Sequence, residues 1–209
     1  ILLLRTNELE IGTWLFKSQG DLAAVLAADA LLASNDGHWF GKEVIALWRR
    51  TLRRLDVSSR SLLAVIEPGS CFAGTLLEIA LACDRSYMLD VLDNAPAIAL
   101  SELNFGPYTM GSGNTRLLTR FGGDAKEADS LRAKVGSALP TAAARELGLV
   151  TFSPDDLDWE EEVRIAVEER TSLSPDALTA MEASLRFGSA ETMETRIFGR
   201  LSAWQNWVF

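Results

Sequence analysis

The sequence predicts an α/β fold with a largely parallel sheet. Short apolar runs of strand length recur over residues 1–152, helical patterns lie between them, and turns rich in Gly, Pro, Asn and Asp separate them. Strands that alternate with helices favour parallel pairing, because parallel neighbours need a long crossover connection. From residue 153 the pattern is helical. We therefore expect a core over residues 1–152 and a helical C-terminal segment over 153–209, used as a lid or in oligomerisation.

The expected elements of the first half follow in order. Strands are predicted at 1–5 and 12–17, and Asp21 is placed to cap a following helix. Residues 39–55 fit an amphipathic helix with a solvated arginine face, formed by Arg49, Arg50, Arg53 and Arg54. A buried strand at 61–66 is ended by Pro68-Gly69, and a helix is expected from about 75 to 83.

The alternation continues in the second half. We predict strands at 85–89 and 97–100, and a helix at 114–121 closed by Gly122-Gly123. A further helix starts at 139–141 and ends near Gly148, and a short strand follows at 149–152. Residues 157–209 are predicted to be helical, with Gly188 and Ser189 between two helices.

Composition excludes several functional classes. The chain has 209 residues, 48% of them hydrophobic, and a net charge of -9, which argues against a nucleic-acid partner. No apolar run approaches the roughly 20 residues that span a bilayer, so we expect no membrane association. Two cysteines, Cys71 and Cys83, and the single His38 argue against a disulfide framework and against a metal site, and favour a cytoplasmic protein. Because it begins without Met and ends on an apolar stretch, the chain is interpreted as a fragment or the ordered part of a longer protein.

The most informative segment runs from Gly69 to Glu78. A buried strand leads into a loop with two glycines and then a helix, whose first N–H groups are free to bind an oxyanion. Glu78 stands among apolar residues, which would raise its pKa and suit it to proton transfer. The alternative is that Thr75 and Glu78 form a capping box, and that Glu78 only satisfies a backbone N–H.

A second carboxylate, Glu102, follows the strand predicted at 97–100. Functional sites of α/β proteins are built at the carboxyl ends of parallel strands. The alternative is a solvated strand end. Local sequence leaves both readings open.

Other segments are assigned no catalytic role. The loop Gly111-Ser112-Gly113-Asn114-Thr115-Arg116 lacks the spacing of a phosphate-binding loop and is interpreted as a helix N-cap. Cys71 is interpreted as a small buried side chain, His38 as an exposed residue near a helix start, and Trp204 and Trp207 as packing residues.

Four of these segments together resemble the crotonase (enoyl-CoA hydratase/isomerase) superfamily. They are Ala73-Gly74-Thr75-Leu76-Leu77-Glu78 with Cys83-Asp84, Ser101-Glu102-Leu103-Asn104-Phe105-Gly106, Gly113-Asn114-Thr115-Arg116-Leu117, and Ala144-Arg145-Glu146-Leu147-Gly148-Leu149-Val150. The resemblance runs through most of residues 1–152. It implies a crotonase-like spiral of ββα units, an acyl-CoA thioester substrate, coenzyme A only as part of that substrate, no other cofactor, and a homo-oligomer.

The resemblance also implies site residues. Glu78 and Glu102 correspond to the two catalytic glutamates. Thr75, next to Gly74, would supply one backbone N–H of an oxyanion hole, and Gly20, in Ser18-Gln19-Gly20-Asp21-Leu22, the other. The family usually has glycine at the position of Thr75, so the hole is expected to differ in shape.

Three segments are unlike ordinary hydratases. The stretches 67–75, 104–106 and 201–207 look like those of the benzoyl-CoA-dihydrodiol lyases of aromatic catabolism. This likeness implies hydrolytic opening of an epoxidised benzoyl-CoA ring with loss of formate. The alternatives are an ordinary enoyl-CoA hydratase or isomerase, and a non-catalytic protein of the same fold that binds acyl-CoA or assembles others. The presence of both glutamates argues against the last.

Overall fold

The computed structural model describes residues 1–187 and 191–208. Its centre is a three-stranded sheet with the order β1-β2-β3, in which both pairings are parallel, as predicted. The strands are β1 (Thr13–Phe16), β2 (Ser61–Ile66) and β3 (Arg85–Met88). All six residues of β2 are buried, because this middle strand has a partner on each edge and side chains packed on each face.

A smaller sheet pairs β4 (Ala97–Ala99) with β5 (Ala138–Pro140) in antiparallel register. A single bridge between Ala73 and Ala99 connects β4 to the loop after β2. The residues that follow β2 and those that follow β4 therefore lie side by side, which is where the sequence places its two glutamates.

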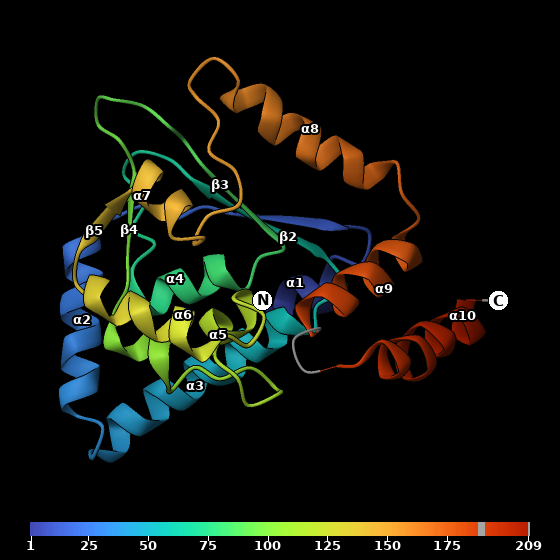
Figure 1. The fold of residues 1–209 in the computed structure, drawn as a ribbon, viewed down its shortest axis with the longest axis horizontal. Helices are drawn as coiled ribbons and strands as arrows, with labels where there is room; N and C mark the ends of the chain where they lie inside the picture. The colour runs from blue at the N-terminus through green and yellow to red at the C-terminus, as the bar shows by residue number, and fades with distance from the viewer. Residues whose placement is uncertain (188–190, 209) are drawn as a thin grey trace.

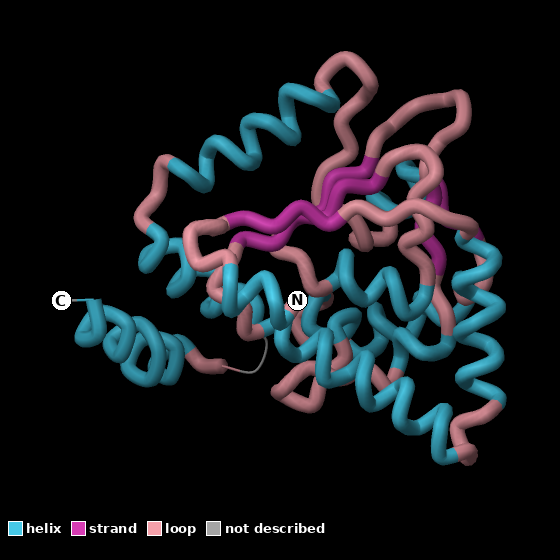
Figure 2. Tube along the Cα trace, turned by 180° about the vertical axis from the view of Figure 1, so that it is seen from behind, coloured by secondary structure: helices cyan, strands magenta, loops and turns pink. Residues whose placement is uncertain are grey.

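Helices cover both faces of the main sheet (Figures 1 and 2). On one face, Leu63 and Val65 of β2 pack with Trp159 and Ala166 of α8 (Trp159–Thr171). The alternate residues of β2 join the larger core on the other face, which includes Leu77 of α4 (Gly74–Leu81). The side chains of a strand point alternately to opposite faces, so one short apolar strand serves both cores.

The remaining helices surround this centre (Figure 1). They are α1 (Leu2–Asn7), α2 (Leu22–Ser34), α3 (Trp39–Asp56), α5 (Arg116–Arg120), α6 (Ala125–Ser130), α7 (Thr141–Glu146), α9 (Pro175–Arg186) and α10 (Ser202–Val208). The 3-10 helices are η1 (Glu102–Phe105) and η2 (Leu131–Lys134), and η4 (Thr195–Leu201) is a π-helix. Throughout the ranges 1–187 and 191–208, every helix is too short or too polar to cross a bilayer.

Most predicted elements are confirmed, but two strands are not. The expected strand at 1–5 is helix α1, which satisfies its own backbone, and Leu3 remains 76% exposed. Residues 149–152 form only one bridge, from Phe152 to Tyr87, because the Thr151 hydroxyl accepts the Ser86 N–H in place of a ladder carbonyl. α6 and η2 were not predicted, because the polar stretch 124–137 has no clear period. β5 occupies 138–140, where a helix was expected to start, and that helix, α7, begins at Thr141.

One further prediction is corrected by the structure, and another falls outside the described residues. Arg53 is not on a fully solvated face, since it donates to the carbonyl and the hydroxyl of Thr109 at 2.9 and 2.8 Å. The expected break at Gly188 and Ser189 lies outside the described residues.

A buried ionic cluster ties the C-terminal segment to the sheet. Arg186 of α9 donates to both carboxylate oxygens of Asp84 at 2.7 and 2.6 Å and to the carbonyl oxygens of Ser58 and Arg60. The division of the chain at residue 152 remains a prediction, and this contact shows that the two predicted parts pack together.

Candidate active site

The start of α4 is shaped around a buried carboxylate. Gly74, its first residue, has φ +42°, and a Cβ there would overlap Asp29 Oδ2 and lie 2.7 Å from Ser101 Oγ. Only glycine adopts this backbone conformation at low cost and leaves this space free. The predicted helix start is thus confirmed, and the reason for its glycine is the side chain of Asp29.

Asp29 is a polar residue that the sequence analysis did not single out. Its Oδ2 accepts the Thr75 N–H at 2.8 Å and the Ser101 hydroxyl at 2.6 Å, and its Oδ1 accepts the Thr75 hydroxyl at 2.6 Å. The side chain is buried, with 2% of the residue exposed. The signal that could have found it is an aspartate in the middle of an otherwise apolar helix, at 22–33.

Thr75 links this carboxylate to a buried phenol. The Thr75 hydroxyl lies 2.8 Å from the hydroxyl of Tyr108, and burial raises the pKa of Tyr108 to about 12. A glycine at position 75 would lack the hydroxyl that joins these two groups. The threonine hydroxyl therefore links Asp29 to Tyr108 in one buried polar network.

Glu78 is buried and fully engaged, but not as a helix cap. α4 is capped at Ala73 without a side-chain bond, so Glu78 lies in the second turn and the capping-box interpretation is wrong. Its carboxylate accepts the Asn104 amide N–H at 2.8 Å and a guanidinium N–H of Arg116 at 3.1 Å. Burial raises the pKa of Glu78 from 4.5 to about 7, against the lowering effects of Arg116 and Asn104. A carboxyl group with such a pKa exchanges protons readily near neutral pH.

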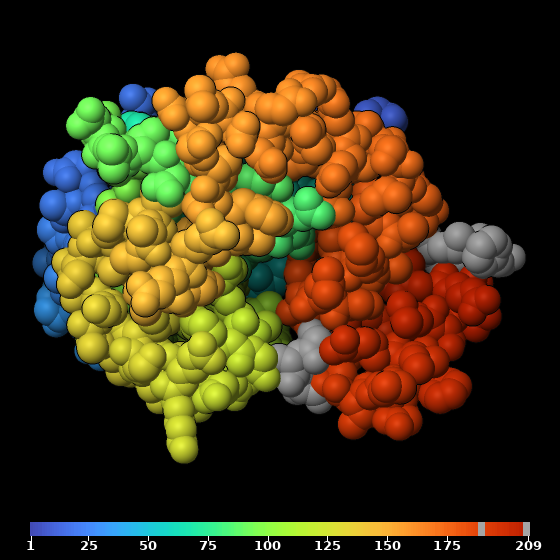
Figure 3. Space-filling view, turned by 45° about the horizontal axis from the view of Figure 1, so that its top comes forward, coloured from blue at the N-terminus to red at the C-terminus, as the bar shows by residue number. Residues whose placement is uncertain are grey.

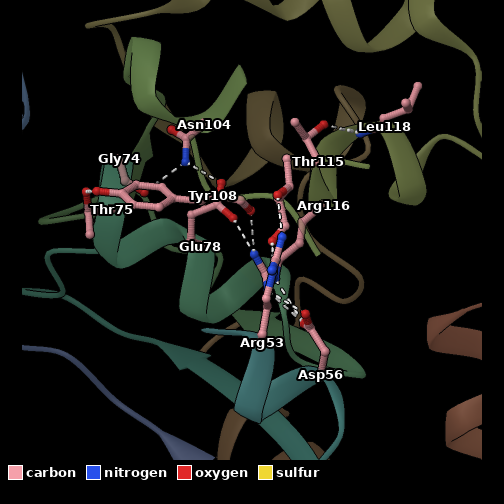
Figure 4. Close-up of polar contacts among 11 residues, drawn as sticks. Arg53, Asp56, Gly74, Thr75, Glu78, Asn104, Tyr108, Thr115, Arg116 and Leu118 are labelled. Atoms are coloured by element: carbon pink, nitrogen blue, oxygen red, sulfur yellow. Dashed lines mark hydrogen bonds and ion pairs between the residues drawn. The ribbon is translucent and has the colours of Figure 1, made fainter. Parts of the chain in front are cut away.

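Arg116 holds two buried carboxylates together (Figure 4). It pairs with Asp56 through Nη2 and Oδ2 at 2.7 Å, with Glu78 through Nη1, and donates to the Tyr108 carbonyl at 3.0 Å. The sequence analysis assigned the preceding loop only an N-cap. That cap is confirmed, since Thr115 accepts the Leu118 N–H at 3.1 Å, but the role of Arg116 was missed.

Asp56 and Arg116 also line a cavity of about 240 Å³, where the surface is hollowed between the yellow-green segment and α9 (Figure 3). Burial raises the pKa of Asp56. The buried ionic network thus runs from Glu78 through Arg116 to Asp56, at a cavity that Asp29 does not line.

Glu102 has a different environment from Glu78. It opens η1 after the cap residue Ser101, its side chain is 65% exposed, and its nearest cation is Arg132 at 3.3 Å. Taken by itself, this exposed position fits the alternative interpretation, a solvated strand end. Glu102 nevertheless lines a cavity of about 410 Å³ together with Asp29 and Ser101, between α2 and η1.

Asn104 connects the two glutamates without bringing them into contact. It belongs to the same 3-10 turn as Glu102, and its amide donates both to Glu78 and to the Gly74 carbonyl. Glu102 lines the 410 Å³ cavity, whereas Glu78 does not. A substrate in the cavity would contact Glu102 directly, and it would reach Glu78 only if the Asn104 side chain moved aside.

The two predicted oxyanion donors already have acceptors. Thr75 N–H donates to Asp29, and Gly20 N–H donates to the Gly69 carbonyl at 3.0 Å. Gly20 also lies against Cys71, whose Sγ would be 3.2 Å from a Cβ at position 20. Gly20 therefore contacts the loop that precedes α4, and its pairing with Thr75 in one oxyanion hole remains a prediction.

The predictions for Cys71 and His38 are confirmed, whereas the packing role predicted for Trp204 remains a prediction. Cys71 is buried, and His38 is exposed and accepts the Phe40 N–H at the start of α3. Trp204 lines a cavity with Gly199, Arg200 and Ala203. The side chain of Trp207 lies outside the described part of the chain.

Comparison with known proteins agrees with the resemblance seen in the sequence. No family model matches the chain. Over all 209 residues it is 60% identical to "Benzoyl-CoA-dihydrodiol lyase" of Aromatoleum evansii, and it spans 38% of that protein's length.

Solved structures agree on the fold. An enoyl-CoA hydratase of Bacillus anthracis matches with a TM-score of 0.60 and 21% identity, over 80% of this chain and 61% of that one. An enoyl-CoA hydratase/isomerase of Cupriavidus metallidurans CH34 matches with a TM-score of 0.62 and 19% identity, over 86% of this chain and 65% of that one. The predicted crotonase-like fold is confirmed.

Proposed function

We propose that this chain carries the thioester site of an acyl-CoA lyase that opens the epoxidised ring of a benzoyl-CoA derivative and releases formate. The observation that carries the proposal is the 60% identity, over the whole chain, to a protein named benzoyl-CoA-dihydrodiol lyase. Since the chain spans 38% of that protein, the activity is proposed for the whole enzyme to which such a chain belongs.

In this proposal Glu78 and Glu102 divide the proton transfers. Glu78, with a pKa of about 7, is partly protonated at neutral pH and is suited to donate a proton. Glu102 is exposed at the wall of the 410 Å³ cavity and is suited to activate a water molecule there. Two carboxyl groups whose environments differ in this way can serve as acid and base in one reaction.

The thioester carbonyl is proposed to bind at the start of α4. The Thr75 N–H, beside Gly74, is the first donor, and the helix dipole favours negative charge at this end. The Gly20 N–H is the second donor. Each N–H must exchange its present acceptor for the carbonyl oxygen, and for Thr75 that acceptor is a carboxylate.

The substrate assay separates this activity from that of an ordinary hydratase. The protein is incubated with 2,3-epoxybenzoyl-CoA and, separately, with crotonyl-CoA, and formate release and hydration are measured. We expect formate from the first and little turnover of the second. Efficient hydration of crotonyl-CoA without formate from the epoxide would favour the hydratase and contradict the proposal.

Variants then test the residues. Glu78→Gln and Glu102→Gln should each lower turnover by roughly 100-fold or more, the usual contribution of general acid–base catalysis. Glu146→Gln, at an exposed position on α7, is the matched control and should keep full activity. Full turnover in both site variants would show that neither carboxylate does the chemistry, and no turnover in the unmodified protein with intact thioester binding would indicate a non-catalytic binding protein.

The expectations of a homo-oligomer, of a cytoplasmic location and of no cofactor besides substrate coenzyme A remain predictions. The helices after residue 152 are suited to a subunit contact, because several large apolar side chains there are exposed, including Phe198 at 75% and Leu185 at 69%. Sedimentation of the purified protein measures the oligomeric state directly.

A further inference from the structure

The strongest unassigned feature is the Asp29 carboxylate on the Thr75 N–H. Three donors converge on it, and the N–H is one of the backbone groups that an α-helix leaves without an internal partner at its start. A carboxylate there is well stabilised, because hydrogen bonds to a charged acceptor are shorter and stronger than those to a neutral one.

We propose that Asp29 competes with the thioester carbonyl for the Thr75 N–H, so that substrate binds only by displacing this carboxylate. The inference rests on the proposed function, in which this N–H is an oxyanion donor. One backbone N–H has room for one acceptor at 2.8 Å, so the carbonyl oxygen and Asp29 Oδ2 cannot both be bonded there.

Asp29 lies between the Thr75 N–H and a cavity that could hold an acyl group. Asp29 and Ser101 line the 410 Å³ cavity, whose other walls are mostly apolar and include Leu26, Ala30 and Leu103. A volume of this size fits the range of small-molecule sites. An aromatic acyl group in this cavity would bring its carbonyl to the side of α4 that Asp29 occupies.

When the carbonyl displaces Asp29 from the Thr75 N–H, the Asp29 carboxylate can keep its other hydrogen-bond partners. The Thr75 hydroxyl binds Oδ1, and the Ser101 hydroxyl binds Oδ2 in addition to the N–H. A small turn of the side chain can give up the N–H and keep both hydroxyls. Asp29 then remains beside the carbonyl, where its negative charge opposes the development of negative charge on the carbonyl oxygen.

The test compares binding of unreactive benzoyl-CoA and of free coenzyme A to the full chain by calorimetry. Asp29→Asn keeps the shape but makes the competing bond a neutral one, so benzoyl-CoA should bind on the order of tenfold more tightly. Coenzyme A has no acyl carbonyl, and its affinity should not change. Asp36→Asn, at an exposed position just after α2, removes the same charge and controls for long-range attraction of the anionic ligand.

The outcomes separate this inference from the proposed function. Unchanged or weaker benzoyl-CoA binding by Asp29→Asn, with tight binding by the unmodified chain, overturns the role of Asp29 and leaves the function standing. If the unmodified chain prefers benzoyl-CoA no more than coenzyme A, the thioester site itself is wrong. Should the variant fail to fold, the amide resonance of Thr75 in the unmodified chain is followed by NMR. It should move strongly with benzoyl-CoA and little with coenzyme A, and equal shifts would refute the competition.

Discussion

Replacing Arg116 by methionine tests the buried ionic network most severely. Methionine is unbranched like the arginine stem but shorter, and it leaves Glu78 and Asp56 without their shared cation, while each of these three side chains is at most 3% exposed. Breaking a buried ion pair by removing one partner costs about 3–5 kcal/mol. We expect a loss of that size in the free energy of unfolding at about pH 8, where both carboxyl groups would have to be charged.

The loss should depend on pH in a definite direction. Arg116 lowers the pKa of Glu78, so its removal raises that pKa above the present value of about 7. Such a carboxyl group has a higher pKa in the folded state than in the unfolded state. Its contribution to the stability of the fold is complete at pH values below the unfolded-state pKa, and it is lost as the pH rises through the folded-state pKa. The deficit of Arg116→Met should therefore shrink towards about pH 5, where Glu78 is protonated.

The assay is urea unfolding followed by tryptophan fluorescence at both pH values. Arg164 offers a matched control, because it also lies between two carboxylates, Glu161 and Glu168, but on the solvated side of α8. Arg164→Met should leave the unfolding midpoint nearly unchanged. A deficit for Arg116→Met that is small at pH 8, or equal at both pH values, would refute the reasoning.

Three further predictions concern single positions. Because the pKa of Glu78 rises from 4.5 to about 7 on folding, the free energy of unfolding should fall by about 3 kcal/mol between about pH 4.5 and pH 8. Glu78→Gln should flatten this decline, and parallel curves of unfolding free energy against pH for the two proteins would contradict the prediction. Gly74→Ala should cost more stability than Gly136→Ala, because both glycines have positive φ but a methyl group overlaps buried atoms only at position 74; equal melting temperatures would count against this. Arg186→Met should loosen α9 by removing the ion pair with Asp84, and limited proteolysis should cut the C-terminal segment sooner; an unchanged digestion pattern would show that the pair does not hold it.

Much of the fold was predictable because its period and its turns are local signals. The strand at 61–66, the cap Asp21 and the helices over 22–34 and 39–56 follow from apolar spacing and side-chain chemistry that a single stretch displays. The helix at 2–7 could not be predicted in this way. An apolar run of strand length becomes a strand only if the edge of a sheet is available to pair with it.

The candidate site was predictable in part, and the limit is physical. Glu78 stood out through its apolar neighbours, and the structure buries it as expected. Its partners Arg116 and Asn104 lie 38 and 26 residues away along the chain, and no local pattern reports such contacts. Asp29 was missed for the same reason, since 46 residues separate it from the N–H that it accepts.

A structure of the protein bound to unreactive benzoyl-CoA tests the central claim, that one thioester site unites Thr75, Glu78 and Glu102. The account predicts the carbonyl oxygen within hydrogen-bond distance of the Thr75 N–H, the ring in the cavity between α2 and η1, and the side chains of both glutamates turned towards the acyl group. A benzoyl group bound elsewhere, or one seated in this cavity with Asp29 still on the Thr75 N–H and Glu102 still turned to Arg132, would contradict it.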